Sequence, residues 1–249
     1  MEDMIVARCS KVHRIYVLGG RGTCCSDDPR LPDGRHPLAG GGMSSPQSST
    51  TTIPQNIVVE KDARVDVVVL VFPGVSADVK LDVHLVGEGA EANVYGAYVC
   101  GGGEKVKIAV DMYHEVPHCN SRQLFKGIAG GSSRVDFYGK IIVAQDAQRT
   151  EAYQENHNIL LSDNAKVDTK PQLEIYADDV KCSHGATIGR LNEEEQFYMR
   201  SRGISLEDAK VLQMISFIAP VLENIEDEAQ RAEAAAAYES DIRNIIRNL

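Results

Sequence analysis

A cysteine and a histidine stand two residues apart near the C-terminal third of the chain, at Cys182 and His184. Residues two apart on a strand point to the same face, so both side chains could meet one metal ion. Thiolate and imidazole are good ligands for zinc or for iron in a sulfide cluster, but such sites need three or four ligands. The pair therefore forms a half-site at most, and the alternative is a buried cysteine beside a hydrogen-bonded histidine.

A second group of metal-ligating residues, His114, His118 and Cys119, surrounds Pro117. The two histidines share a face only if the strand is regular, and the proline favours a bend. Metal binding is therefore the weaker hypothesis at this group. His84 alternates with apolar neighbours on a predicted half-buried strand, so we expect its side chain to face solvent.

The motifs of common catalytic and nucleotide sites are missing from the sequence. Gly-x-Ser-x-Gly does not occur, which argues against acyl transfer. The glycines of Gly20-Arg21-Gly22 lack the third glycine and the helix of a dinucleotide loop, and no Walker-type loop is found. Asp178 and Asp179 would point to opposite faces of a strand, so they predict a solvated turn or an interface and not an acid–base pair.

Composition narrows the class of protein further. The 249 residues carry a net charge of −10, with no run of Lys or Arg among aromatic residues, so nucleic acid and anionic lipid are poor partners. The longest apolar run, 67–72, is six residues long, whereas a membrane helix needs about 18 or more. No signal peptide is recognised, and six cysteines without repeated short spacing predict free thiols, so we expect a cytoplasmic protein.

The elements that would position these residues fall into three segments, and the first, 1–56, differs from the rest. It contains Gly40-Gly41-Gly42 and a tract of Ser, Thr, Pro and Gln at 44–55, without a sustained apolar period. We therefore expect a low-complexity, disordered leader.

Residues 57–190 carry strand signals almost without a break and are expected to form an all-β core. Strand openings recur at steps of 14, 15, 12, 29 and 32 residues, at Val65, Val79, Val94, Val106, Val135 and Val167. Such steps are typical of sandwich hairpins or of the coils of a solenoid. Because Asn-Gly and Asp-Gly hairpin turns are absent from this stretch, the pattern favours a β-solenoid.

Residues 191–249 change to a helical period. Asn192 and the acidic residues after it begin one helix, which Gly203 ends, and Ser205 begins a second helix, which Pro220 ends or bends. The apolar face of the second helix consists of Val211, Leu212, Met214, Ile215, Ile218 and Ala219. A third, Ala-rich helix has a stripe of Tyr238, Ile242, Ile245, Ile246 and Leu249. An apolar helical face after a solenoid either caps the last coil or docks a partner, and the cap is the simpler expectation.

Three separated motifs resemble the SufB/SufD family of scaffold proteins of the SUF iron–sulfur cluster assembly system, in particular its SufD-type members. They are KPQLEIYADDVKCSHGAT at 170–187, FYMRSRGI at 197–204 and CNSRQL at 119–124. Their order along the chain also agrees with the family, and the resemblance covers roughly residues 60–249.

The resemblance implies a right-handed parallel β-helix followed by a C-terminal α-helical region, and a non-catalytic scaffold. Partners would be a SufB-like paralogue or a second copy, paired through the β-helix cores, and a SufC-like ATPase. His184 matches the family histidine at the subunit interface and Cys182 lies beside it, so both are candidate ligands of a shared half-site. No permanent cofactor is implied, only a transient iron–sulfur cluster at the interface. Candidate contacts with the ATPase are Leu206, Val211, Met214, Ile215 and Ile218.

The sequence departs from the family pattern at its beginning, where a helical domain usually precedes the β-helix. We expect either a naturally short form or a misassigned start, with Met43 as an alternative first residue. Two other functions stay open on the residues alone. One is a β-helix enzyme acting on polysaccharides, and the other is a self-assembling structural solenoid.

Overall fold

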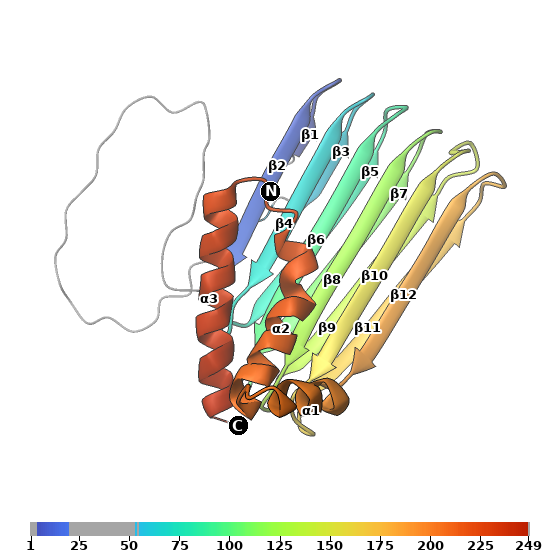
Figure 1. Cartoon of the computed structure of the whole chain (residues 1–249). Coiled ribbons are helices and arrows are strands. Elements are labelled where there is room, and N and C mark those ends of the chain that lie inside the picture. Colours follow the sequence, from blue (N-terminus) through green and yellow to red (C-terminus); the bar gives the residue numbers. More distant parts are fainter. Residues whose placement is uncertain (1–3, 20–52, 54, 249) are drawn as a thin grey trace, which may run out of the picture.

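The computed structural model describes residues 4–19, 53 and 55–248, and within them the chain coils into a solenoid of two parallel sheets (Figure 1). Sheet A consists of β1 (Met4–Val6), β3 (Asn56–Val59), β5 (Ala77–Leu85), β7 (Lys105–His114), β9 (Arg134–Val143) and β11 (Lys166–Ile175). Sheet B consists of β2 (Lys11–Leu18), β4 (Arg64–Val71), β6 (Glu91–Cys100), β8 (Asn120–Ala129), β10 (Glu151–Leu160) and β12 (Lys181–Gly189). The helices α1 (Glu193–Ser201), α2 (Leu206–Leu222) and α3 (Glu228–Arg247) follow.

The strand spacing in the sequence reflects two strands in each coil. Val106, Val135 and Val167 are register partners on β7, β9 and β11, so the steps of 29 and 32 residues are complete coils. Val65 and Val79 lie on successive strands of opposite sheets, so the step of 14 residues is half a coil. Every described strand pair is parallel. The solenoid prediction is therefore confirmed, and hairpins of a sandwich are not what the pattern means.

The expectation of a disordered leader is wrong for residues 4–18, which form β1 and β2. Val6 is fully buried in the core between the sheets. On β2, Tyr16 packs against that core while Val17 packs under the C-terminal helices, so apolar residues occupy both faces. A strand covered on both faces loses the two-residue alternation that identifies half-buried strands, which is why the pattern failed to show it. Gly20-Arg21-Gly22, Gly40-Gly41-Gly42 and Met43 lie outside the described residues.

Glycines make room for large side chains inside the solenoid. A Cβ atom at Gly127 would lie 1.8 Å from the ring of Tyr98, and one at Gly139 would lie 1.8 Å from the side-chain nitrogen of Gln154. Tyr98 donates to Asn158, and Asn158 donates to Asn156 over 2.7 Å. The interior is thus apolar in the first coils and contains a hydrogen-bonded polar cluster in the last ones.

The helices begin at the predicted caps. The side chain of Asn192 accepts from the backbone N–H of Glu194 and Glu195, and Ser205 accepts from that of Asp208. Gly203 follows α1 with φ of 87°, a left-handed conformation that suits a helix end. α2 continues through Pro220 to Leu222, so the proline does not end the helix.

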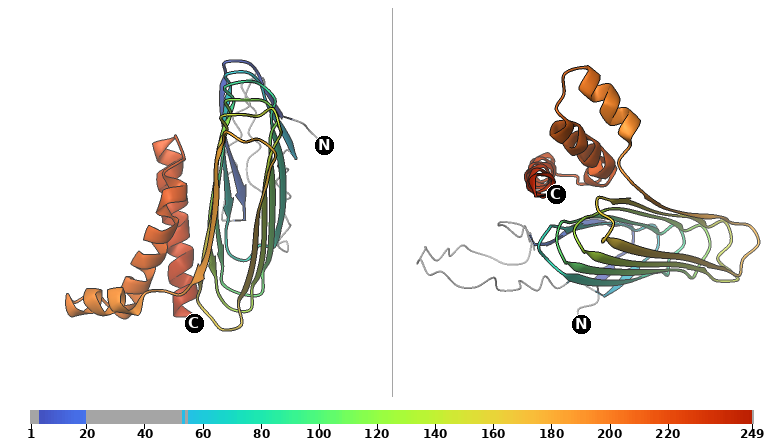
Figure 2. Two further views of the ribbon diagram at one scale, coloured as in Figure 1. Left: turned by 90° about the vertical axis from the view of Figure 1, so that its right-hand side faces the viewer. Right: turned by 90° about the horizontal axis from the view of Figure 1, so that it is seen from below.

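α2 and α3 cover the outer face of sheet B and do not cap the last coil (Figure 2). Val211, Met214 and Ile218 of α2 are fully buried in an outer apolar cluster with Val68 and Leu124 of the sheet. The predicted apolar face is therefore real, but it lies against the side of the solenoid, because sheet B presents apolar residues outward at β4, β6 and β8. No helix of the described residues has the length and apolar character that a bilayer span requires.

Candidate functional site

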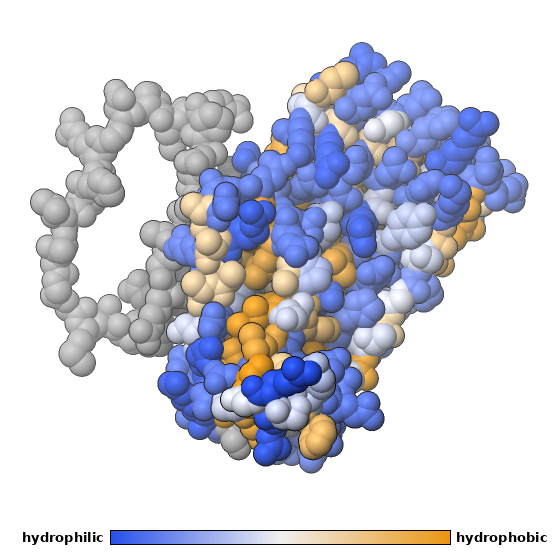
Figure 3. Space-filling view, in the orientation of Figure 1, coloured by the Kyte–Doolittle hydropathy of each residue, from blue (hydrophilic) through white to orange (hydrophobic). Residues whose placement is uncertain are grey.

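The last coil leaves one end of the solenoid open. Among the described strands, β11 and β12 each have a hydrogen-bonded neighbour on one side only. Side chains that point inward from these strands lack the next coil, so Ile175 is 39% and Ile188 is 45% exposed. Figure 3 shows apolar atoms along this right-hand edge of the molecule. An unpaired strand edge with exposed apolar residues is a surface that favours pairing with another chain.

Cys182 and His184 lie on β12 at this open end. Their register partners on β10 are the fully buried Ala152 and the inward-facing Gln154, so both side chains share the inward face, as the spacing predicted. Cys182 is half-buried against the core between the sheets, while His184 is exposed. Burial raises the pKa of the Cys182 thiol above its usual value, which disfavours the thiolate in the chain as it stands.

Two buried glutamines precede His184 in the same row of sheet B, and the sequence reasoning missed them. Gln123 and Gln154 are register partners, and Gln154 is the register partner of His184. Gln154 Nε2 donates to Gln123 Oε1 over 2.8 Å, and both residues are at most 1% exposed. Their spacing, 31 and then 30 residues along the chain, equals one coil each. That coil length was the signal that could have aligned all three side chains.

The second predicted cluster does not assemble. His114 is buried at the end of β7, where its Nε2 lies 2.8 Å from Ser121 Oγ. His118 sits in the following turn with a positive φ of 61°, and the Cys119 thiol donates to the carbonyl of Gly87. Within the part of the chain that the structure describes, no group of three or more His, Cys, Asp or Glu side chains is placed to hold a metal ion.

Two other predictions concern outward-facing groups. His84 faces outward, stacks on Tyr113 and lies 2.8 Å from Glu115 through Nδ1, so it has partners besides solvent. Asp178 and Asp179 are exposed in the turn between β11 and β12, which confirms the predicted turn.

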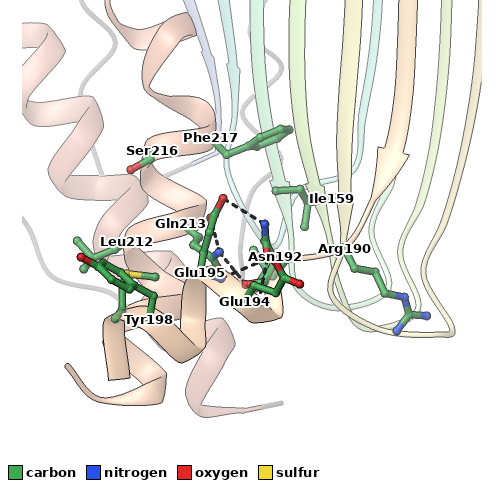
Figure 4. A pocket seen from close by; sticks show the side chains of 12 residues that line it. Ile159, Arg190, Asn192, Glu194, Glu195, Tyr198, Leu212, Gln213, Ser216 and Phe217 are labelled. Carbon is green, nitrogen blue, oxygen red and sulfur yellow. Dashed lines mark hydrogen bonds between the residues drawn. The ribbon is translucent and has the colours of Figure 1, made fainter. Parts of the chain in front are cut away.

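A groove of about 650 Å³ separates α1 and α2 from the end of the sheet (Figure 4). Figure 4 shows Ile159 with Phe217 at one end and Tyr198 with Leu212 at the other. Between them, Gln213 Nε2 donates to the carbonyl of Asn192 and to a Glu195 carboxylate oxygen, at 3.0 and 2.7 Å, which fastens α1 to α2. Figure 2 shows α1 projecting away from the solenoid.

The predicted ATPase contacts on α2 separate into buried and accessible residues. Val211, Met214 and Ile218 have no exposed surface, so they cannot touch a partner in this arrangement, and their selection is wrong. The reason is that the longest apolar stripe of a helix is used first for its own sheet. Ile215 is partly buried, and Leu206 is 42% exposed. Large exposed residues that the prediction missed are Phe197, Tyr198 and Leu212, at 73%, 60% and 45%.

Comparison with known proteins gives a consistent family. The model of the family described as "SUF system FeS cluster assembly, SufBD core domain" matches residues 44–217. The chain is 50% identical over 123 residues to the iron–sulfur cluster assembly protein SufD of Escherichia coli (strain K12), covering 49% of this chain and 29% of that protein.

More distant relatives agree. An iron–sulfur cluster assembly SufBD family protein of Mycobacterium leprae is 30% identical over 190 residues, 73% of this chain and 48% of the relative. The chloroplastic protein ABCI7 of Arabidopsis thaliana is 44% identical over 119 residues, 47% of this chain and 25% of the relative. The chain thus spans less than half the length of each of these relatives.

Proposed function

Because the chain belongs to the SufBD core family of the SUF iron–sulfur cluster assembly system, we propose that it is a non-catalytic scaffold subunit on which clusters are assembled at a junction with a second subunit. The observation that carries this proposal is the open end of the solenoid. It combines two unpaired strand edges, exposed inward-facing isoleucines and the Cys182–His184 pair on one surface.

The partner at this end is a second solenoid, either a SufB-like paralogue or another copy of this chain. A second solenoid offers parallel strand edges of the same spacing, and it would cover Ile175 and Ile188. Cys182 and His184 would then supply two ligands and the partner would supply the others, which meets the three or four that iron or a cluster requires. The iron–sulfur cluster is cargo of this junction and leaves it.

The second partner is a SufC-like ATPase, and the exposed residues around α1 are its contact. Phe197 and Tyr198 are large aromatic side chains on solvent, a type enriched at protein interfaces. Leu206 and Leu212 extend this apolar surface onto α2, beside the groove of Figure 4. Since α1 is fastened to α2, and α2 to sheet B, a displacement of α1 by the ATPase would be passed to the scaffold.

Complex formation tests the proposal directly. The chain is mixed with purified SufB-like and SufC-like proteins, and the products are separated by size-exclusion chromatography under anaerobic conditions. We expect a complex that contains all three chains. Elution of this chain alone in every mixture, at concentrations well above 10 µM, would contradict the scaffold role.

Iron and sulfide analysis of that complex tests the site. His184→Ala should lower the cluster content several-fold without preventing assembly of the complex. His157→Ala is the matched control, because His157 lies on the outer face of sheet B with Thr187 as its neighbour. A cluster content that His184→Ala leaves unchanged would refute the assignment of this histidine.

A further inference from the structure

Gln154 carries a buried hydrogen-bonding atom without a partner, directly beside His184. The residue is 1% exposed and its Nε2 is committed to Gln123. Its carbonyl oxygen, Oε1, has no hydrogen-bond partner within the described chain. A buried acceptor without a partner is costly, so such an atom marks either strain or a bond that forms in another state.

The position of the Gln154 side chain is fixed by what surrounds it. Its amide nitrogen lies where a Cβ atom of residue 139 would stand, so Gly139 is required for the amide to fit. The hydrogen bond to Gln123 holds the amide on the other side. Gln154 therefore cannot turn away to solvent, and its acceptor has to be satisfied from the open end of the solenoid.

His184 is the donor that the topology brings to this acceptor. It is the register partner of Gln154 on the next strand, and both side chains point inward. The inward neighbours of His184 on β12 are Cys182 and Ala186, which offer a weak thiol donor and no donor. Described contacts give the His184 ring no hydrogen bond or ion pair, so a rotation of its side chain breaks no such interaction.

We propose that Gln154 is a positioning residue for His184. Its carbonyl oxygen accepts a hydrogen bond from one ring nitrogen of His184 and leaves the other nitrogen, with its lone pair, facing the open end. In a neutral imidazole, the nitrogen that donates decides which one can act as a ligand. The Gln123–Gln154 pair thus selects the tautomer of His184 and restricts its ring. The consequence for cluster assembly rests on the proposed function, but the tautomer itself does not.

Nitrogen-15 NMR of the isolated chain, labelled at its histidines, tests this proposal without partner, ATPase or cluster. At pH 8 an ordinary histidine is neutral, so the ring nitrogen shifts report the tautomer. The His184 signal is assigned from the spectrum of His184→Asn. We expect one tautomer to be favoured in the parent, and Gln154→Met to reduce this preference about fivefold, as expected for the loss of one hydrogen bond.

Thr169→Val is the matched control. Thr169 Oγ1 is another buried oxygen without a partner, on β11 of the same coil, and its removal should leave the His184 tautomer unchanged. An equal tautomer mixture for His184 in the parent overturns the proposal, even if Gln154→Met does not fold. So does a folded Gln154→Met whose His184 spectrum equals that of the parent. Failure of the chromatography experiment would instead remove the scaffold role and leave this result standing.

Discussion

Inside the solenoid, the identity of individual side chains changes along its axis. The first coils stack valines, such as Val67 and Val94, and the later coils bury Gln123, Gln154 and Asn156. Apolar side chains pack in many arrangements, whereas each buried amide needs its own partner and so specifies a unique arrangement. Residues near the open end are therefore the most narrowly determined of the core, and His184 follows them directly.

His114 is one of these buried polar residues, and its protonation opposes folding. Burial lowers the pKa of its ring to about 4, from an ordinary value of 6.5. As the pH falls below 6.5 the unfolded chain binds a proton that the folded chain refuses, so stability decreases between about pH 6.5 and 4. At pH 5 this effect reaches roughly 2 kcal/mol relative to pH 7.

Urea unfolding at pH 7 and pH 5 measures this contribution when the parent is compared with His114→Gln. The glutamine keeps a polar contact with Ser121 and has no titrating group. We expect the free energy of unfolding of the variant to fall less between the two pH values, by about 2 kcal/mol. The same decrease in both proteins would mean that His114 takes up its proton in the folded state at an ordinary pKa.

At the scale of elements, α3 is fixed to sheet B through one aromatic side chain. The Tyr238 ring stacks on Phe72 with centroids 4.1 Å apart, and its hydroxyl donates to the carbonyls of Ala97 and Val71 at 3.0 and 3.3 Å. Tyr238 is fully buried, so these bonds are not exchanged for water. Truncation of such a side chain leaves a cavity that neighbouring residues fill only in part.

Two substitutions separate the ring of Tyr238 from its hydroxyl. Tyr238→Phe should lower the free energy of unfolding by about 1 kcal/mol, and Tyr238→Ala by about 3–5 kcal/mol. Tyr198→Phe is the control, because that residue is 60% exposed on α1 and should change stability by less than about 0.5 kcal/mol. Urea unfolding of the three variants checks these values. A Tyr238→Ala variant as stable as the parent would show that α3 is not anchored by this residue.

Elements were predictable where one physical signal determined them. The alternation at 79–85 and the coil-length steps between valines identified the solenoid, because inward residues repeat with the coil. Asn192 and Ser205 identified helix starts, because their side chains cap free N–H groups. β2 was missed because its two faces are both covered. The packing of α2 was also missed, since the same apolar stripe suits a coil end, a sheet face or a partner.

The candidate site was predictable only in part. The spacing of Cys182 and His184 was enough to place them on one face, because a strand has a fixed two-residue period. The glutamines behind His184 are 30 and 61 residues before it, and only the register of the coils brings them together. Exposure of Phe197 depends on which helix reaches the sheet first, and this is a property of the folded molecule.

On the scale of the whole molecule, the two candidate partner surfaces are separate. The open end is formed by β11 and β12, whereas the aromatic surface belongs to α1, which projects from the side (Figure 2). The layer formed by α2 and α3 connects them through sheet B. This separation allows a scaffold to hold one partner permanently while another binds and leaves, and it makes the two contacts independent in an experiment.

Ile188→Lys and Phe197→Lys should therefore abolish different interactions. Ile188 points inward at the open end and Phe197 lies on α1, and both are already exposed, so a lysine at either position is compatible with folding. Burying a large apolar side chain stabilises a complex by about 1.5–3 kcal/mol, and a buried lysine adds a further cost, so each contact should weaken at least about tenfold. Ile188→Lys should lose the solenoid partner and keep the ATPase, and Phe197→Lys should do the reverse. Titration calorimetry of each variant with each partner gives the four affinities, and each variant is the control for the other. Equal weakening of both partners by one substitution would mean that the two surfaces form a single interface or that the variant has lost its fold, and circular dichroism separates these two outcomes.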